Sequence, residues 1–403
     1  MRRVVITGVG TLNALGGDYA TTAAAMQAGK CGIGPLTCRD VDRLTVRVGA
    51  EIQGFEPEQH FARNALPLLD RFAQIALVAA RQAVTQSGLE MTEALALRSG
   101  VIMGTAGGGN LTVDDNYRMV YAEGKNRVHP FVVPRLMQNA ATSHISMEFG
   151  LKGPAFTVST ACASANHAMG QAFQMVRTGM ADIMLTGGSD AMLGFGGIKA
   201  WEGLRVMARD TCRPFSRDRS GMVQGEGGGV FVFEELDHAR ARGAQILAEV
   251  AGFGMSADAG DIVMPDMDGP VRAMRAALAD AGVAPQDVGY VNAHGTGTAA
   301  NDRVESHALR AVMGGHLDRL PVSSTKSMHG HIIGGTSAVE MLACLMALNE
   351  GVIAPTINHT EADPDCVPDP VPNEARQARV DVVMSNAFAF GGLNAVLVLR
   401  RLV

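Results

Sequence analysis

The stretch TVSTACASANH, residues 157–167, organises both the fold and the chemistry of this chain. The β-branched run 156–159 predicts a buried strand, and residues 163–178 predict a helix that Gly179 ends. Cys162 is then expected in the first turn of that helix, where free N–H groups and the helix dipole favour a thiolate. A thiolate attacks thioesters and carbonyls. Taken alone, the pattern fits a small buried cysteine without a catalytic role as well.

The composition is typical of a compact enzyme. At 403 residues, with 47% apolar and 18% charged residues, the chain is long enough for two to three domains around a large core. A net charge of −6 without a basic block gives no electrostatic footprint for nucleic acid. Six cysteines without a CxxC pair favour free thiols in a reducing compartment.

The N-terminus begins directly with a strand pattern, Val4 to Thr7, and no apolar signal segment precedes it. The longest apolar run near a helix, 341–348, is far shorter than the ~20 residues of a membrane span. We therefore expect a cytoplasmic protein without an integral membrane segment, bound to a membrane at most peripherally.

Gly8 and Gly10 follow the first strand, as the glycines of a dinucleotide-binding turn do. Asn13 stands where the third glycine of that fingerprint belongs, and no acidic residue follows a second strand at the expected offset. We interpret both glycines as positions where a strand packs closely on a helix. An amphipathic pattern over 68–87, ended by Gly88, predicts a long helix.

The segment from about residue 105 to residue 150 has little periodic core pattern. It follows a short strand and a glycine loop, and it combines helical pieces with the turn-rich segment 130–134. Such an excursion is where a cap over the substrate or an oligomer contact would lie.

The order of strands and helices recurs once along the chain. Residues 157–178 and 322–348 each run from a strand through a Ser/Thr-rich turn into a small-residue helix, and each is followed by a strand, a glycine loop and a terminal strand. The long, irregular period excludes a solenoid and predicts an α/β fold with two halves, 1–244 and 245–403, related by a pseudo-twofold axis.

The candidate reactive residues all follow predicted strands. Ligands of open α/β sheets bind beyond the carboxyl ends of the strands, and Cys162, His294, Lys326 and Phe390 fall there. A loop histidine is usually a surface or structural group, but His294 and His331 are both set among glycines at strand ends, as groups that reach a shared cleft would be. No third and fourth ligand with suitable spacing accompanies them, so we expect no metal.

Four segments together resemble one enzyme family. The segments TACASA (160–165), NAHGTGT (292–298) and KSMHGH (326–331) resemble the three active-site motifs of elongating β-ketoacyl-acyl-carrier-protein synthases. The segment NAFAFGG (386–392) resembles their C-terminal gating loop, which would span 385–394 here. The resemblance runs in order from Val4 to Leu399. KAWE (199–202) and DTCRPFS (210–216) are similar to the synthase II branch, which includes nodulation-type synthases.

The resemblance implies the thiolase fold, with two similar halves in five layers, α-β-α-β-α, and normally a homodimer. It implies a decarboxylative Claisen condensation of an acyl-Cys162 enzyme with malonyl-acyl-carrier protein. The product is a 3-ketoacyl-acyl-carrier protein of fatty acid, specialised lipid or polyketide synthesis. The substrates arrive on the phosphopantetheine arm of the carrier, so no cofactor is implied, although a structural monovalent cation is compatible with the family.

The residue roles follow from the same resemblance. Cys162 takes the acyl chain, and the N–H groups of Cys162 and Phe390 stabilise the oxyanion. His294 and His331 stabilise the enolate that is left when CO2 departs. Lys326, paired with Glu340, is expected to bias the charges around His331. Thr296 and Thr298 are expected to contact the phosphopantetheine arm, and Phe388 is expected to contact the substrate. Asp302 and Glu305 are expected to be structural.

The chain departs from the family pattern at four positions. His329 replaces a usual threonine, Ala389 a usual glycine and Leu393 a usual threonine. We expect Ala389 to stiffen the gating loop, because alanine does not visit positive φ as glycine does. Gly107 stands where many synthase II enzymes carry a bulky aliphatic residue, so we expect it to leave room for long or kinked acyl chains.

Carrier proteins are acidic, so a local basic rim is expected despite the net negative charge. The candidates are Arg63, Arg71, Lys125, Arg127, Arg205 and Arg209.

Alternative enzyme classes fit less well. A thiolase needs a second cysteine in the loop 385–394, which has none. A starter-type synthase pairs its cysteine with histidine and asparagine, and a cysteine hydrolase needs an orienting Asn or Asp that nothing supplies. A non-catalytic chain-length factor typically loses the nucleophile, whereas Cys162 is present.

Overall fold

A computed structural model describes residues 1–402. In this part of the chain ten strands form one sheet, with the order β10-β9-β13-β14-β8-β1-β7-β6-β4-β5. In chain order these strands are β1 (Val4–Asn13), β4 (Ser99–Gly104), β5 (Ala155–Val158), β6 (Ile183–Asp190), β7 (Gly227–Glu235), β8 (Ala248–Ala257), β9 (Tyr290–Asn292), β10 (Val322–Ser323), β13 (Val382–Ala389) and β14 (Leu393–Arg400). Two short ribbons lie outside it, β2 (Gly34–Pro35) with β3 (Val48–Gly49) and β11 (Val352–Ile353) with β12 (Arg376–Gln377).

The sheet consists of two five-stranded halves with the same topology, as the sequence repeat predicts. In the N-terminal half β1–β7 and β7–β6 are antiparallel, and β6–β4 and β4–β5 are parallel. In the C-terminal half β8–β14 and β14–β13 are antiparallel, and β13–β9 and β9–β10 are parallel. The halves join where Val4–Ile6 of β1 pairs with Ala248–Val250 of β8, so the two expected sheets are continuous through a three-residue seam.

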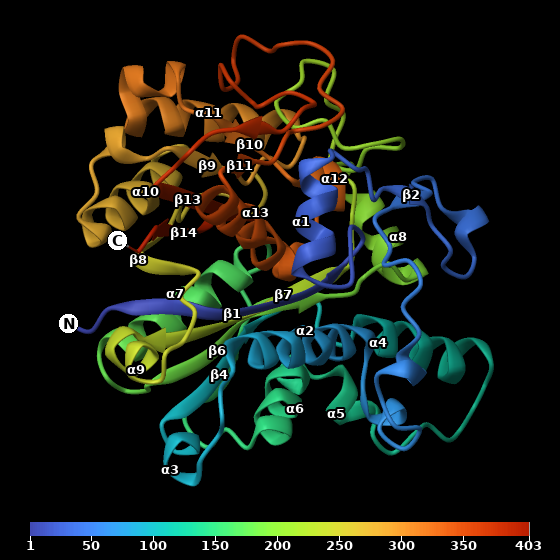
Figure 1. Cartoon of the computed structure of the whole chain (residues 1–403). Coiled ribbons are helices and arrows are strands. Elements are labelled where there is room, and N and C mark those ends of the chain that lie inside the picture. The colour runs from blue at the N-terminus through green and yellow to red at the C-terminus, as the bar shows by residue number, and fades with distance from the viewer. Residues whose placement is uncertain (403) are drawn as a thin grey trace.

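The helices stack on both sides of each half-sheet (Figure 1). The helices are α1 (Tyr19–Gln27), α2 (Arg71–Ser87), α3 (Glu93–Ala96), α4 (Asn110–Tyr117), α5 (Val132–Leu136), α6 (Ala140–Phe149), α7 (Ser164–Arg177), α8 (Phe195–Gly203), α9 (Leu236–Ala241), α10 (Asp268–Ala281), α11 (Ala299–Met313), α12 (Lys326–His329) and α13 (Thr336–Glu350). Helices α2 and α6 cover the outer face of the N-terminal half, and α10 and α11 cover that of the C-terminal half. Between the halves lie α7 and α13, which gives the five layers of the thiolase fold.

The central layer is the most buried part of the chain. Every residue of α13 from Thr336 to Leu348 is buried, because the helix contacts strands of both halves as well as α7. A helix that is apolar all round is stable only in such a position. The α7–α13 layer therefore fixes the spacing of the loops that precede each of these two helices.

Gly8 and Gly10 do pack a strand against a helix, as interpreted from the sequence. A Cβ atom on Gly8 would lie 2.1 Å from the carbonyl oxygen of Ala83, and one on Gly10 would lie 2.0 Å from that of Ala79. Both carbonyls belong to α2, which ends at Gly88 with a positive φ of 62°. The two glycines thus let β1 approach α2 closely.

The strand before Cys162 differs from expectation. It was predicted to be buried, but β5 is the edge strand of the sheet and Phe156 is 37% exposed. An apolar run predicts a strand but carries no information about its place in the sheet. The edge therefore leaves unpaired backbone groups next to exposed apolar side chains.

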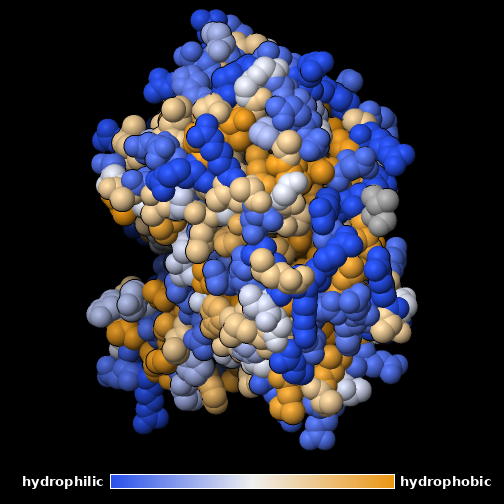
Figure 2. Space-filling model, turned by 90° about the vertical axis from the view of Figure 1, so that its left-hand side faces the viewer, coloured by the Kyte–Doolittle hydropathy of each residue, from blue (hydrophilic) through white to orange (hydrophobic). Residues whose placement is uncertain are grey.

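The chain ends are tied together on one side of the molecule. The carboxylate of Glu249, on β8, accepts hydrogen bonds from Arg3 and from Arg400, near the two termini. Figure 2 shows this side, where hydrophilic side chains surround smaller groups of apolar ones. Within residues 1–402, no helix has both the length and the apolar character that crossing a bilayer requires.

Candidate active site

The nucleophile candidate lies in a strained turn between β5 and α7. Ala161 has a φ of 47°, in the left-handed region that alanine rarely adopts. The Ser164 hydroxyl donates to the Ala161 carbonyl at 2.6 Å and accepts from the Thr160 N–H at 2.9 Å, which closes the turn. Helix α7 begins at Ser164, so Cys162 precedes the helix rather than occupying its first turn.

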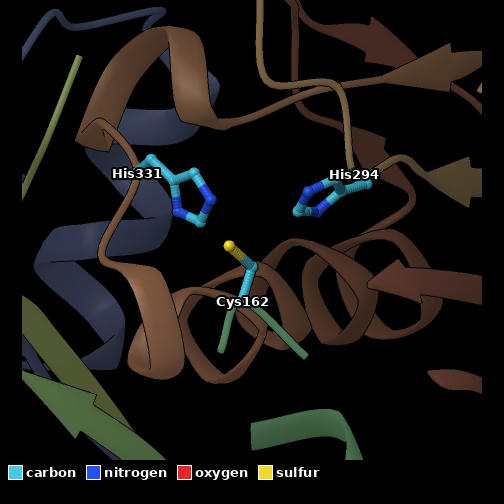
Figure 3. Close-up of side chains that lie close together, drawn as sticks. All are labelled: Cys162, His294 and His331. Carbon is cyan, nitrogen blue, oxygen red and sulfur yellow. The ribbon is translucent and has the colours of Figure 1, made fainter. Parts of the chain in front are cut away.

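Cys162, His294 and His331 meet in one cavity (Figure 3). The Cys162 sulfur and one ring nitrogen of each histidine all lie within 4.8 Å of one another. The imidazole centroids are 5.6 Å apart and the rings are nearly perpendicular, at 84°. The cysteine comes from the N-terminal half and both histidines come from the C-terminal half, so the duplicated fold brings the three predicted groups together.

The loop that carries His294 is fixed by a buried carboxylate. Glu305, on α11, accepts hydrogen bonds from the His294 and Gly295 N–H groups at 2.8 and 2.7 Å. Asp302, one turn earlier, accepts from the N–H groups of Phe215 and Gly297 at 2.9 and 3.2 Å. Both acids contact backbone rather than the cavity, which is the geometry of structural support.

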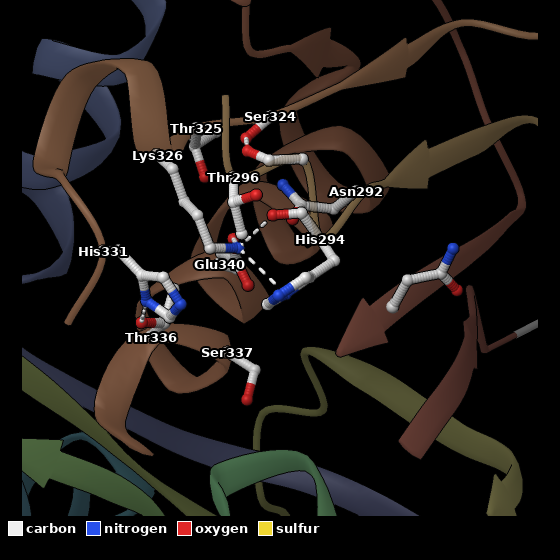
Figure 4. A network of polar contacts seen from close by, with 12 residues as sticks. Asn292, His294, Thr296, Ser324, Thr325, Lys326, His331, Thr336, Ser337 and Glu340 are labelled. Atoms are coloured by element: carbon white, nitrogen blue, oxygen red, sulfur yellow. Dashed lines mark hydrogen bonds and ion pairs between the residues drawn. The ribbon is translucent and has the colours of Figure 1, made fainter. Parts of the chain in front are cut away.

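Lys326 is paired with Glu340, as the resemblance implies, and it also lies beside His294, a contact that the sequence did not predict (Figure 4). Its Nζ is 2.5 Å from Glu340 Oε1 and 3.4 Å from His294 Nδ1, and it also donates to the His294 carbonyl. The fully buried ammonium thus bridges α13 to the His294 loop. Its charge still reaches His331 through space, because it lowers the pKa of that imidazole as well.

Both imidazoles are neutral. Burial is the main cause that holds the pKa of His294 and of His331 well below the ordinary 6.5, and the Lys326 ammonium lowers both further. Lys326 donates to Nδ1 of His294, and the Ile333 N–H donates to Nδ1 of His331 at 3.0 Å. Each ring must then carry its proton on Nε2. The site therefore holds two neutral N–H donors.

The thiol of Cys162 is not the activated thiolate expected from a helix N-terminus. Burial raises its pKa from 9.0 to about 11, although the Lys326 charge and the N–H groups of Phe390 and Cys162 oppose that effect. The expectation was wrong because the sequence gives the position of the helix but not the desolvation around the sulfur.

Phe390 belongs to a tight hairpin. Most residues of the predicted gating loop 385–394 belong to two paired antiparallel strands, because β13 continues to Ala389, which pairs with Leu393 of β14. Only residues 390–392 leave the strands. The Phe390 N–H and the Cys162 N–H both lower the pKa of the Cys162 thiol, so both backbone donors lie close to its sulfur. An oxyanion formed on a carbonyl attacked by this sulfur would lie between them.

The substrate-contact candidates divide into two groups. Thr296, Thr298 and Phe388 line the cavity, and the two threonine hydroxyls are 2.8 Å apart. Gly107 does not line it. A Cβ atom there would lie 2.5 Å from the sulfur of Met192, so Gly107 makes room for that side chain.

His329 is buried behind the site. Its Nδ1 lies 2.8 Å from the Gly330 carbonyl and its Nε2 lies 2.9 Å from the Thr325 hydroxyl. Burial lowers its pKa to about 3, so the ring is neutral and bridges the two ends of the turn before His331. It contacts the loop of a catalytic candidate rather than the cavity.

The candidate carrier-docking residues do not form one rim. Arg71 is paired with Glu226 at 2.6 Å and Lys125 with Glu123 at 2.8 Å. Arg63 and Arg127 are exposed. Only Arg205 and Arg209 line a common groove, which Lys199 also lines and which adjoins α8 beside the cavity.

Asp190 and the loop 258–267 are parts of the site that the sequence did not single out. Asp190, at the carboxyl end of β6, accepts hydrogen bonds from the N–H groups of Ala106, Gly107 and Gly334 at 2.9, 3.0 and 2.7 Å. The strand-end rule that selected the other residues could have found it. The loop contributes five cavity-lining residues, Asp258, Asp261, Val263, Met264 and Pro265, and has no sequence signal of its own.

A buried thiol, two backbone N–H groups beside its sulfur and two neutral imidazole donors on a duplicated α/β scaffold are the arrangement that a thiol-dependent acyltransferase requires. Comparison with known families agrees. The profile described as "Beta-ketoacyl synthase, N-terminal domain" matches residues 1–239, and the one described as "Beta-ketoacyl synthase, C-terminal domain" matches residues 247–360. The chain belongs to the β-ketoacyl synthase family, and it is an acyltransferase of the decarboxylative condensing type.

Curated relatives and solved structures cover the whole chain. Nodulation protein E of Rhizobium sp. (strain N33) is 51% identical over 99% of both chains. The 3-oxoacyl-[acyl-carrier-protein] synthase 2 of Staphylococcus aureus (strain COL) is 40% identical over 99% of this chain and 98% of its own. The ishigamide ketosynthase/chain length factor superposes with a TM-score of 0.95 at 38% identity, and a type II polyketide ketosynthase in complex with its acyl-carrier protein does so with 0.90 at 28%; both comparisons cover 100% of both chains.

Proposed function

We propose that Cys162 receives the acyl chain and that His294 and His331 drive its condensation with a malonyl unit on a carrier protein. One observation carries the assignment of roles: the sulfur and two neutral imidazoles reach one cavity from separate halves of the chain.

In the first step, the Cys162 sulfur attacks the carbonyl carbon of the acyl-carrier thioester. The N–H groups of Cys162 and Phe390 hold the oxyanion, a contribution of about 2.7–4 kcal/mol for each donor. The C–S bond to the carrier's pantetheine then breaks. One thiol is exchanged for another, so the proton that Cys162 loses is the proton that the pantetheine sulfur gains.

In the second step, malonyl-carrier enters and its C–C bond to the carboxylate breaks. CO2 leaves, and the bonding electrons form an enolate. The enolate oxygen accepts hydrogen bonds from the Nε2–H groups of His294 and His331. The carbanion carbon attacks the acyl-Cys162 carbonyl, the C–S bond breaks, and Cys162 leaves as a thiolate, which then takes one proton from solvent water. No proton is removed from carbon, so two neutral donors suit this step better than a donor and a base.

Lys326 and Glu340 set the tautomer of His294. The Lys326 ammonium donates a hydrogen bond to Nδ1 of His294, so Nδ1 carries no proton and the ring must present Nε2–H to the cavity. Burial raises the pKa of the Glu340 carboxyl, and the adjacent ammonium opposes that effect. Neither residue needs to touch the reacting carbon atoms for this role.

The same region has the donor set for a monovalent cation. Asn292 Oδ1, Glu340 Oε2 and Asn386 Oδ1 are buried without a hydrogen-bond partner. Asn292 lies on β9, and its neighbour on the same face of the sheet, Tyr290, lies close to Glu340 of α13; the Asn386 side chain lies on the other face, where it donates to Glu305. A neutral amide oxygen with one carboxylate fits a hard cation, which Asn292 and Glu340 would hold.

The proposed partners are an acyl carrier protein and a second copy of this chain. The exposed Arg205 and Arg209 beside the cavity suit an acidic carrier. The edge strand β5 with Phe156, and the exposed Tyr117, Tyr121 and Phe131, suit an interface between two copies. The identities to 3-oxoacyl-[acyl-carrier-protein] synthase 2 and to nodulation protein E support a role in fatty acid or specialised lipid synthesis, which we place in the cytoplasm.

The test is intact-mass spectrometry after incubation with acyl-carrier proteins of graded chain length. We expect the wild-type mass to rise by one acyl group, the Cys162→Ala variant to stay unmodified, and malonyl-carrier to discharge the acyl group as a 3-ketoacyl product. Acylation of the Cys162→Ala variant, or an acyl-enzyme that malonyl-carrier does not discharge, would refute the proposal.

A further inference from the structure

Phe390 does not close the cavity alone, because its ring is stacked on Trp201 of α8. The ring centroids are 5.8 Å apart and the planes differ by 23°. Both side chains are half-buried and both line the cavity. We propose that Trp201 is a positioning residue that holds Phe390 where its N–H reaches the Cys162 sulfur. This inference rests on the proposed role of that N–H as an oxyanion donor.

Trp201 is carried by an anchored element. The next residue, Glu202, accepts hydrogen bonds from the N–H groups of Thr45 and Val46 at 2.5 and 2.8 Å and from Lys199 at 2.7 Å. The C-terminal end of α8 is therefore tied to the segment before β3. Trp201 is the fixed member of the stack.

Phe390 is carried by a turn that can move. Gly391 and Gly392 have φ values of 81° and 68°, so the hairpin turns on two glycines. Its outer contacts are backbone bonds to the loop 258–267, from the Gly391 N–H to Ile262 at 2.8 Å and from the Asp258 N–H to Gly392 at 2.9 Å. Phe390 is the only residue of the turn 390–392 that has an apolar side chain.

The cavity is too small for a long acyl chain while this stack is intact. Its volume is about 150 Å³, below the 300–1,000 Å³ of ordinary ligand pockets. Phe390 must leave Trp201 for a chain to enter, and its N–H then leaves the sulfur. When Phe390 stacks on Trp201 again, its N–H returns to the Cys162 sulfur. The aromatic pair therefore couples closure of the cavity to formation of the pair of oxyanion donors.

The first test uses fluorescence, because Trp201 is the only tryptophan in the chain. We expect acrylamide to quench Trp201 more strongly in the resting Phe390→Leu variant than in the wild type, by at least twofold in the quenching constant. Leu204→Ala is the matched control, since Leu204 caps the same helix at 44% exposure and should leave quenching unchanged. Equal quenching in wild type and Phe390→Leu would overturn the inference. This test needs no turnover, so it stands apart from the proposed function.

The second test measures acyl transfer to Cys162 from octanoyl-pantetheine. Loss of an aromatic pair should lower kcat of Trp201→Leu about two- to tenfold, with KM unchanged because the pair acts on the transition state. Trp201→Phe should restore the rate, since it keeps a ring to stack on. Wild-type kcat in Trp201→Leu, or no rescue by Trp201→Phe, would contradict the positioning role.

Discussion

The high pKa of the Cys162 thiol gives a direct prediction about its reactivity. Burial raises this pKa to about 11, which disfavours the thiolate by about 3 kcal/mol relative to a thiol at 9.0. About one sulfur in 10⁴ is then ionised at pH 7, and each pH unit up to 11 raises that fraction tenfold. The rate of alkylation should rise about 100-fold between pH 7 and pH 9 without reaching a plateau.

The assay is alkylation by iodoacetamide, a neutral reagent, followed by intact-mass spectrometry at a series of pH values. Subtracting the modification of Cys162→Ser removes the contribution of the other five cysteines. Lys326→Met should lower the rate further at every pH below 11, because its charge favours the thiolate. A plateau with a midpoint below pH 8 would refute the reasoning and restore activation by the helix N-terminus.

Four further predictions concern separate parts of the site. His331→Ala should slow decarboxylation of malonyl-carrier about 10²–10³-fold while acylation of Cys162 persists, as measured by CO2 release against intact mass. Glu305→Gln should cost about 1–3 kcal/mol of unfolding free energy in a denaturant titration, because an amide N–H2 would face one of two backbone N–H groups. Gly107→Ile should lower the free energy of unfolding and leave the accepted chain length unchanged, because its side chain would meet the Met192 sulfur and neither residue lines the cavity; a shortened chain-length profile would contradict this. Carrier binding should weaken with added salt, and Arg205→Glu with Arg209→Glu should remove most of that salt dependence.

Periodic patterns and strand-end positions predicted most of the scaffold. The segments around 157–178 and 322–348 predicted the duplicated halves, and the strand-end rule placed Cys162, His294, Lys326 and Phe390 at one edge of the sheet. These features depend on local sequence and on the topology of parallel strands. Both are legible without coordinates.

Three features could not be predicted from the sequence because they depend on tertiary packing. The edge position of β5 follows from which strands find partners, and an apolar run does not encode that. The contact of Lys326 with His294 depends on how α12 and the His294 loop face each other. The pKa of Cys162 depends on how much protein surrounds the sulfur. In each case the residue was identified and its environment was not.

The two halves divide the chemistry, and a buried carboxylate joins them. Asp190 of the N-terminal half accepts N–H bonds from its own half at Gly107 and from the C-terminal half at Gly334, three residues beyond His331. Burial raises the pKa of Asp190 to about 6, and these donors oppose that effect. The ionised carboxylate is therefore stabilised from both halves: by the Thr105 hydroxyl and two N–H groups of the N-terminal half, and by the Gly334 N–H of the C-terminal half. Because the same charge disfavours the thiolate of Cys162, the group that joins the halves also adds to the raised pKa of the Cys162 thiol, of which burial is the main cause.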